Sequence, residues 1–216
     1  MLKVGIAGLG KMGQIRAREA EKRSGVELVA VYEANDTLTP DLPPSTKRVD
    51  SFEALLDSGI DAVFVCAYNN VAADYCIKAI KKGLHVFCEK PPATTSTELK
   101  EVIKAEKQSS VVLKYGFNHR LHYSVLEAKK LIDSKEMGKL LWLRGVYGKA
   151  GSIDYHKNWR NFKKYSGGGI LMDQGIHMLD LIHYLTQRRY ETVSSVLSAA
   201  YWDVGVEDNA LSLIHI

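Results

Sequence analysis

Residues Leu2–Gly13 read LKVGIAGLGKMG, in which a short apolar run is followed directly by a run of glycines. The apolar run Leu2–Ala7 is typical of a buried strand, and the periodicity of Lys11–Arg23 predicts a helix. Gly25 is placed to end that helix. A G-x-G-x-x-G run between a strand and a helix lets backbone N–H groups approach a pyrophosphate. This stretch therefore predicts a dinucleotide-binding turn.

Glu33 lies 20 residues after Gly13, at the end of Val26–Tyr32, a valine-rich run that predicts the second strand. An acidic side chain at this place binds the ribose hydroxyls of NAD and would repel the 2′-phosphate of NADP, so we expect NAD. The alternative is a turn that needs glycine for its geometry alone. The cofactor-binding residues predicted here are Gly8, Gly10, Lys11, Met12, Gly13 and Glu33.

Strand and helix signals continue to alternate as far as Tyr115. Apolar strands separated by helices are typical of a parallel, doubly wound α/β sheet that is buried on both faces. The sequence predicts a loop at Asn35–Lys47, a short helix capped by Asp50 with Glu53 and ended by Gly59, a strand at Ala62–Ala67, a helix at Val71–Lys82, a strand at Leu84–Cys88, a helix opened by Thr95 with Glu98 and reaching Gln108, and a strand at Val111–Tyr115.

The alternation changes after Phe117, where longer strands and polar loops begin. We expect two domains, residues 1–118 and 119–216, of which the second is an α+β domain with an open sheet. Its predicted elements are helices at His122–Ser134 and Ile170–Thr186, strands at Leu140–Lys149 and Thr192–Trp202, and a further strand that begins near Asp208.

The composition excludes several classes of protein. Hydrophobic residues make up 46% and charged residues 25% of the 216, which is ordinary for a globular protein. The net charge of +4 is mild and the basic residues are scattered, so no nucleic-acid partner is expected. There is no apolar run of the roughly 18 residues that span a membrane and no export signal after Met1, so we expect a cytoplasmic protein. Cys66, Cys76 and Cys88 lack metal-ligand spacing and are expected to be reduced.

Two further segments resemble the motifs of one enzyme family. Gly83–Pro91 reads GLHVFCEKP, and Gly167–His177 reads GGGILMDQGIH. Together with the glycine-rich turn, they resemble the Gfo/Idh/MocA oxidoreductases in order and spacing, over the chain up to about Ala210. The resemblance implies an N-terminal Rossmann domain, a C-terminal α/β domain whose open sheet often forms oligomers, and NAD(P)-dependent chemistry at a sugar or cyclitol carbon. Tyr155–Asn161, YHKNWRN, is most similar to members of surface-polysaccharide and nucleotide-sugar pathways.

The loop after the third predicted strand departs from the family pattern. Many members have Thr-Pro-Asn-x-x-His there, whereas this chain has Ala67-Tyr68-Asn69 and, at the histidine position, Ala72. The loop on the cofactor side is therefore partly different, while Asn69 is kept. The resemblance implies that the cofactor is also contacted by Ala67, Asn69, Glu89 and Lys90.

Three side chains are candidates for the chemistry of alcohol oxidation, which needs a base for the hydroxyl proton. Lys90 follows the carboxyl end of a strand, where its amine could bridge the nicotinamide ribose and the reacting hydroxyl. A solvated surface lysine is the alternative. Asp173 and His177 share one face of the predicted helix with Asp180. His177, with a reference pKa of about 6.5, is predicted to be the general acid–base and Asp173 its support. An ordinary surface pair is the alternative, and two such residues are too few for a metal site.

Substrate contacts are predicted at the domain junction and in the loop before the glycines. Asn118 and Arg120 lie at the junction, and domain junctions often form ligand clefts. Arg120 suits a carboxylate or phosphate of the substrate, and equally an ion pair between the domains. Tyr155, Trp159 and Arg160 suit a sugar or nucleotide face, with a packed loop as the alternative.

These features predict an NAD-dependent oxidoreductase that acts on a secondary alcohol of a sugar, cyclitol or nucleotide sugar and forms a homo-oligomer at full length. The alternatives are a nucleotide sensor without catalysis on the same fold, and an enzyme that uses tightly bound NAD for transient oxidation. Leu211–Ile216, LSLIHI, resembles the translation of a sequencing adapter. With few strands predicted for the second sheet, we expect a C-terminally truncated chain, and a natural short strand is the alternative.

Overall fold

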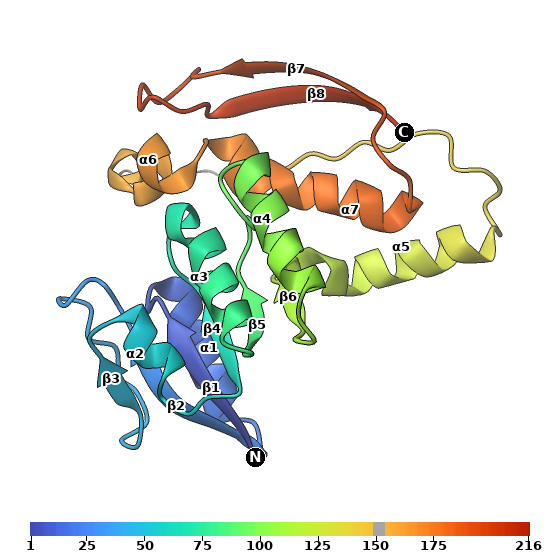
Figure 1. The fold of residues 1–216 in the computed structure, drawn as a ribbon. Coiled ribbons are helices and arrows are strands. Elements are labelled where there is room, and N and C mark those ends of the chain that lie inside the picture. Colours follow the sequence, from blue (N-terminus) through green and yellow to red (C-terminus); the bar gives the residue numbers. More distant parts are fainter. Residues whose placement is uncertain (149–153) are drawn as a thin grey trace. The chain divides into compact units, whose positions relative to one another are not determined.

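The computed structural model describes residues 1–148 and 154–216, which fold into two compact units, Met1–Gly116 and Phe117–Ile216 (Figure 1). The first unit alternates strands and helices along its whole length. Its elements are β1 (Leu2–Ala7), α1 (Lys11–Glu21), β2 (Val26–Tyr32), β3 (Lys47–Val49), α2 (Phe52–Leu56), β4 (Ala62–Val65), α3 (Asn69–Lys81), β5 (His85–Cys88), α4 (Ser96–Lys107) and β6 (Leu113–Tyr115).

The strands of the first unit form one sheet in the order β3-β2-β1-β4-β5-β6, and every neighbouring pair is parallel. The doubly wound parallel sheet predicted from the sequence is therefore confirmed. The chain builds outward from β1 in one direction and then from β4 in the other. In open sheets of this kind, ligands bind outside the carboxyl ends of the strands at the point where the order reverses.

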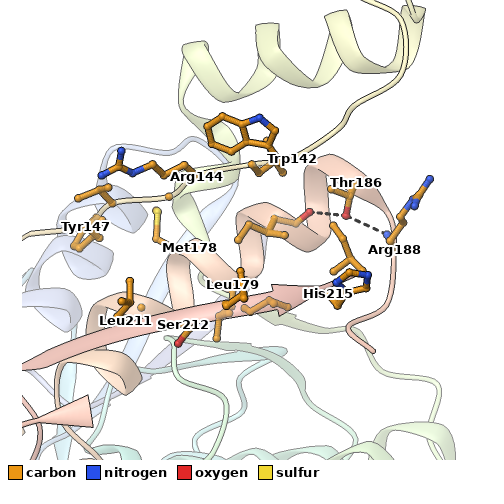
Figure 2. A pocket seen from close by; sticks show the side chains of 18 of the residues that line it. Trp142, Arg144, Tyr147, Met178, Leu179, Thr186, Arg188, Leu211, Ser212 and His215 are labelled. Carbon is orange, nitrogen blue, oxygen red and sulfur yellow. Dashed lines mark hydrogen bonds between the residues drawn. The ribbon is translucent and has the colours of Figure 1, made fainter. Parts of the chain in front are cut away.

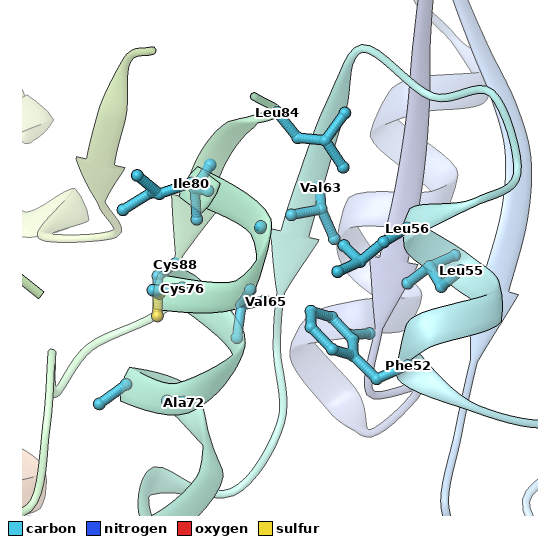
Figure 3. Close-up of a cluster of buried hydrophobic side chains, with 14 of the residues drawn as sticks. Phe52, Leu55, Leu56, Val63, Val65, Ala72, Cys76, Ile80, Leu84 and Cys88 are labelled. Atoms are coloured by element: carbon cyan, nitrogen blue, oxygen red, sulfur yellow. The ribbon is translucent and has the colours of Figure 1, made fainter. Parts of the chain in front are cut away.

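Helices cover both faces of this sheet because successive side chains of a strand point to opposite sides. Val4 and Ile6 of β1 belong to a buried cluster that includes Ala17 of α1. Ala7 belongs to a second buried cluster, formed with α2, α3 and α4. In Figure 3 this second cluster includes side chains of α2 and β4, namely Phe52, Leu55, Leu56, Val63 and Val65.

The edge strand β3 is missing from the sequence prediction, which places a loop at residues 35–47. The strand is three residues long and pairs in parallel with β2, from Ala30 opposite Lys47 to Tyr32 opposite Val49. So short a strand contains no periodicity that could distinguish it from a loop.

The start of α2 is also corrected. Ser51, and not Asp50, is the N-cap: its hydroxyl accepts the N–H of Ala54 at 3.0 Å. The helix begins one residue later than predicted, which moves the capping position with it. The capping box of Thr95 and Glu98 at the start of α4 is confirmed.

The second unit combines helices with a two-stranded antiparallel sheet, as predicted for an α+β domain. Its strands pair from Thr192 opposite His215 to Ser198 opposite Asn209. None of the helices in the described parts of the chain is long and apolar enough to cross a membrane. The elements are η1 (Asn118–Leu121), α5 (Tyr123–Ser134), η2 (Tyr155–Lys157), η3 (Trp159–Asn161), α6 (Lys163–Ser166), η4 (Leu171–Gly175), α7 (Ile176–Thr186), β7 (Thr192–Ser198) and β8 (Asn209–His215).

The predicted strand at 140–149 is wrong over its described part. Residues 140–148 form no strand, and residue 149 lies outside the described residues. Alternating apolar residues make a strand only where a partner edge pairs with them. In the described residues of this unit, β7 and β8 pair only with each other.

The strand predicted to reach Trp202 ends at Ser198. The Asp208 carboxylate accepts the N–H groups of Ala200, Tyr201 and Trp202 at 2.7, 2.7 and 2.5 Å. The strand ends here because these three N–H groups donate to Asp208 and are not available for pairing in the sheet.

The predicted helix at 170–186 begins with one π-helical turn, η4, before α7. The Ile170 N–H donates to the Glu207 carbonyl oxygen at 2.8 Å, and the Leu171 N–H to its Oε1 at 3.3 Å. A Cβ on Gly169 would lie 1.9 Å from that carbonyl oxygen, so only glycine permits this approach. The chain around Glu207 therefore holds the first turn, which is π-helical where the sequence predicted a regular α-helix.

Candidate active site

One edge of the first unit's sheet collects the positions predicted to bind the cofactor. The glycine turn follows β1, Glu33 follows β2, Ala67 follows β4, and Glu89 and Lys90 follow β5. Because these neighbouring strands are parallel, their carboxyl ends meet at the same edge of the sheet. The structure thus brings together positions as far apart in the sequence as Gly8 and Lys90.

The glycines of the turn serve different purposes. Gly8 has a φ of +94°, and a Cβ there would lie 2.6 Å from the Cys66 carbonyl oxygen. A Cβ on Gly13 would lie 1.9 Å from the Gly8 carbonyl oxygen, so only glycine lets α1 pack against the turn. At Gly10 an added Cβ would meet no heavy atom within 4 Å. Open space therefore lies beside the backbone at the start of α1.

The start of α1 is suited to an anion. Lys11 and Met12 are its first residues, and Gly10 at the N-cap has no side chain with which to cap their N–H groups. The first N–H groups of a helix and its dipole favour a negatively charged group. The residues of the turn therefore fit the pyrophosphate of a dinucleotide.

The Glu33 carboxylate lies against this turn. Its Oε2 accepts the Leu9 N–H at 2.5 Å and its Oε1 accepts the Asn35 N–H at 3.0 Å. Gln14 of α1 donates from its side chain to the Leu9 carbonyl oxygen at 3.0 Å. The turn, the end of β2 and α1 are thus tied together. This arrangement fits the predicted contact between an acidic side chain and a ribose next to the pyrophosphate.

The loops after β4 and β5 complete this edge. Asn69 is the first residue of α3 and is buried, as is Ala72. The backbone nitrogen of Ala67 lies close to the turn, 2.8 Å from where a Cβ of Gly8 would be. Lys90 is half-buried, and the peptide bond between Lys90 and Pro91 is cis.

Glu89 is engaged by a residue that the sequence analysis missed. Its Oε1 accepts Nε and Nη2 of Arg16 at 2.9 and 2.6 Å, and the guanidinium lies 4.7 Å from the centroid of the Phe87 ring. A Cβ on Gly116 would lie 2.7 Å from the other carboxylate oxygen. Nothing in the sequence pattern links Arg16 and Glu89, which are 73 residues apart.

Asp173 in the second unit is buried and held by two neighbours. Its Oδ1 accepts Nε of Arg160 at 3.2 Å, and its Oδ2 accepts the amide of Gln174 at 2.7 Å. The Arg160 guanidinium lies 4.5 Å from the centroid of the Trp159 ring. Trp159 and Arg160, both predicted to bind substrate, are therefore coupled to the predicted support of the base. Tyr155 is near enough for Asp173 to raise its pKa, after the larger effect of burial.

His177 is buried in a group of aromatic rings. The ring of His119 stacks on it, with centroids 3.8 Å apart and planes inclined by 24°. Tyr147 lies 6.1 Å away, and Phe117 approaches edge-on at 6.4 Å. The sequence indicates no role for His119, because nothing in its spacing from His177 suggests that the two rings meet.

Arg120 forms an ion pair within the second unit. Its Nε donates to Asp180 Oδ2 at 2.8 Å and its Nη2 to Oδ1, so the pair is bidentate. The Asp180 carboxylate, by this hydrogen bond, raises the pKa of Arg120 above its ordinary value. The alternative of an ion pair between the domains is corrected to one inside a single unit. Asn118, also predicted to bind substrate, is exposed at the start of η1.

A cavity of about 1560 Å³ lies along the other side of α7, within the second unit (Figure 2). Met178 and Leu179 line it from the helix, Trp142 lines it from the segment 140–148, and Leu211 lines it from β8. At about 100° per residue Leu179 lies opposite His177, and Met178 lies about a quarter turn from it. Among the described residues that line the cavity, neither Asp173 nor His177 occurs.

The described residues contain no group of three or more His, Cys, Asp and Glu side chains that could hold a metal ion. Cys66, Cys76 and Cys88 are free thiols, and burial raises the pKa of the Cys66 thiol. A buried thiol of raised pKa is a poor nucleophile.

Comparison with known proteins covers both units. A family model described as an oxidoreductase family with an NAD-binding Rossmann fold matches residues 2–117, and one described as a GFO/IDH/MocA C-terminal domain matches residues 125–216. An inositol 2-dehydrogenase of Salmonella paratyphi B is 31% identical over 199 residues, covering 89% of this chain and 56% of that protein. A scyllo-inositol 2-dehydrogenase (NAD(+)) of Bacillus subtilis is 29% identical over 218 residues, covering 97% of this chain and 62% of that protein.

A solved structure gives the same correspondence. The crystal structure of a myo-inositol 2-dehydrogenase from Lactobacillus plantarum matches with a TM-score of 0.84 at 29% identity, covering 99% of this chain and 66% of that chain. This chain therefore spans less than two thirds of the length of each of these three proteins.

Proposed function

This chain belongs to the Gfo/Idh/MocA family of oxidoreductases, and from that premise we propose that it is an NAD-dependent oxidoreductase acting on a secondary alcohol of a sugar, cyclitol or nucleotide sugar. The observation that carries the proposal is the glycine turn with the Glu33 carboxylate against it. The names of the two inositol dehydrogenases support a polyol substrate. In this proposal residues 1–118 bind the cofactor, residues 119–216 bind the substrate, and the full-length form is a homo-oligomer.

The preference for NAD over NADP rests on Glu33. Its carboxylate, held by the Leu9 and Asn35 N–H groups, can accept hydrogen bonds from ribose hydroxyls. A 2′-phosphate at the same place would bring two negative charges together, which is unfavourable. NAD, when bound, accepts a hydride from the substrate carbon.

The residues of this chain then have to bind and deprotonate the alcohol. Lys90 is proposed to bind the reacting hydroxyl through its amine, where it stabilises the oxygen as charge develops. His177 takes the hydroxyl proton on its imidazole, and the carbinol carbon becomes a carbonyl carbon as the hydride departs. Asp173 stabilises the protonated imidazole. Arg160 and Gln174 support this role because they fix both oxygens of that carboxylate.

Four side chains are proposed as substrate contacts. Trp159 and Arg160 present an aromatic face and a guanidinium from η3, a combination that suits a sugar ring with hydroxyl or phosphate groups. Asn118 is exposed on η1. Arg120 has two of its nitrogens on Asp180, so a substrate anion would bind to its remaining N–H groups.

The Lys90→Ala variant tests the proposal. It is expected to abolish turnover while NAD still binds, because the glycine turn and Glu33 carry most of the cofactor contacts. Tryptophan-to-NADH energy transfer or calorimetry measures binding, and NADH absorbance measures turnover with a panel of cyclitols, sugars and nucleotide sugars. Lys104→Ala, an exposed lysine on α4, is the control. Turnover by Lys90→Ala at the rate of this control would refute the role of Lys90.

A further inference from the structure

The stack of His119 on His177 has no place in the mechanism so far. His119 belongs to η1, whereas His177 belongs to the first turn of α7, and 58 residues of chain separate them. Their ring centroids are 3.8 Å apart, and the planes are inclined by only 24°. His177 is 5% exposed. A face-to-face contact of this kind covers one side of the imidazole and limits the orientations that its ring can adopt.

Other aromatic rings enclose the pair. Tyr147 lies 5.5 Å from His119 and 6.1 Å from His177, inclined by 33° to both rings. His122 approaches the other ring of the pair, His119, at 5.1 Å and nearly at a right angle. Phe117 lies edge-on to His177. The group therefore contains three histidines, a tyrosine and a phenylalanine, which come from η1 and its two flanking residues, from α7 and from the segment before residue 149.

Charged groups on the same elements are already committed to partners. Asp173, four residues before His177, binds Arg160 of η3. Asp180, three residues after it, binds Arg120 of η1. The titratable and charged groups on these elements and against the stack include these two ion pairs, His122 and Tyr147. Because each ion pair is close to neutral overall, a proton on one imidazole acts directly on the imidazole stacked against it.

Two imidazolium rings at 3.8 Å repel each other strongly. A pair of groups that interact so closely takes up its protons in two separate steps, which belong to the pair and not to either ring. Only one proton is therefore bound over the range in which a lone histidine would titrate. The ring that has accepted a proton keeps its neighbour neutral.

We propose that His119 is the positioning residue of His177: it fixes the orientation of the imidazole by stacking and shares a single proton with it. The inference rests on the proposed role of His177 as the acid–base group. In the proposed reaction His177 accepts the proton of the substrate hydroxyl, and the stacked neutral ring of His119 remains in place. No bond to His119 forms or breaks, and no additional reactant is needed.

Three variants separate stacking from titration. His119→Phe keeps an aromatic ring on His177 but cannot bind a proton. His119→Gln removes the ring and keeps a polar side chain. It replaces His119→Phe in the test if the phenyl ring prevents folding. His183→Phe is the matched control, because His183 is an exposed histidine on the same helix, bound to the Arg188 carbonyl.

The test is a proton NMR titration of the histidine C2–H resonances in the 216-residue chain, with His177 assigned by substitution. In the parent chain and in His183→Phe, His177 is expected to titrate in two steps separated by more than about one pH unit. In His119→Phe and His119→Gln it is expected to titrate in one step. A single, identical step for His177 in all four chains would overturn the proposal.

The pH profile of turnover distinguishes this inference from the proposed function. If both hold, the acidic limb of kcat/KM moves with the NMR midpoint of His177 in His119→Phe, whereas in His183→Phe it stays in place. If His177 titrates in two steps but the pH profile of kcat/KM does not follow them, His177 is not the base, whereas the shared proton is still supported. Loss of a merely structural contact would shift the midpoint of a single step by changing the burial of His177, whereas only a coupled proton splits its titration into two steps.

Discussion

The ion pair of Arg120 and Asp180 gives a quantitative test of how the second unit is held together. Arg120 of η1 and Asp180 of α7 are joined by two hydrogen bonds, of which the one from Nε is 2.8 Å long. The Asp180 side chain is 7% exposed and that of Arg120 39%. Arg120→Ala would leave a buried carboxylate without its cation, and this is the perturbation to make.

The geometry sets the expected size of the effect. At the 2.8 Å separation, Coulomb's law with an effective dielectric constant of about 20 gives about 6 kcal/mol. Water at the exposed guanidinium screens part of this, and water that enters the space left by the side chain hydrates Asp180. We therefore expect Arg120→Ala to lower the free energy of unfolding by about 2–3 kcal/mol. Adding Asp180→Asn is expected to restore about 1 kcal/mol, because a neutral amide is cheaper to bury than a lone carboxylate.

The assay can report on the second unit alone. All three tryptophans, Trp142, Trp159 and Trp202, lie in Phe117–Ile216. Denaturant unfolding followed by tryptophan fluorescence thus measures this unit, whatever the stability of the other. Lys157→Ala breaks an ion pair with Asp154 whose side chains are both about two thirds exposed, so it should cost less than about 1 kcal/mol. Equal losses of unfolding free energy in Arg120→Ala and Lys157→Ala would show that the buried ion pair contributes no more than an exposed one. A lack of rescue by Asp180→Asn would show that the lone carboxylate is not the cause of the loss.

Three further predictions concern other parts of the chain. Glu33→Ala should weaken NAD binding about tenfold and should change NADP binding little. Calorimetry with both nucleotides measures this, and an unchanged affinity for NAD would contradict it. Gly169→Ala should destabilise the second unit by about 1–3 kcal/mol, because its Cβ would overlap the Glu207 carbonyl. Gly148→Ala, where a Cβ meets no atom within 4 Å, is the control, and an equal effect of both would contradict the overlap. Although burial raises the pKa of Asp208, three N–H groups outweigh this and hold it below its ordinary value. The stabilisation is therefore present above the ordinary carboxyl range and is lost as the pH falls through the lowered pKa. In Asp208→Asn the free energy of unfolding, followed by tryptophan fluorescence, should depend less on acidic pH. An unchanged pH dependence would contradict this role of Asp208.

The first unit could be predicted from the sequence because its signals are local. The strand–glycine–helix pattern of Leu2–Gly13, the acidic residue after β2 and the capping box of Thr95 are all contained in short windows. Each window suffices because a strand buried on both faces and a helix N-terminus have strong sequence requirements. β3 could not be predicted, because three residues at a sheet edge have no such sequence requirement.

The second unit was harder to predict because its structure depends on distant contacts. The π-helical turn before α7 is held by Glu207, which is 36 residues from Leu171. The stack on His177 and the ion pair of Arg120 also join residues that are far apart in the chain. No periodicity records such contacts, so the spacing of Asp173 and His177 suggested one regular helix where there is a π-helical turn followed by an α-helix.

We propose that this chain catalyses hydride transfer from a polyol to NAD bound at the glycine turn. The most direct measurement is the appearance of NADH absorbance when the purified chain is mixed with NAD and each of a panel of inositols, sugars and nucleotide sugars. We expect NADH formation that depends on the substrate and that His177→Ala slows by about 10²–10⁴-fold. NAD binding without NADH formation from any member of the panel, or an undiminished rate in His177→Ala, would contradict it.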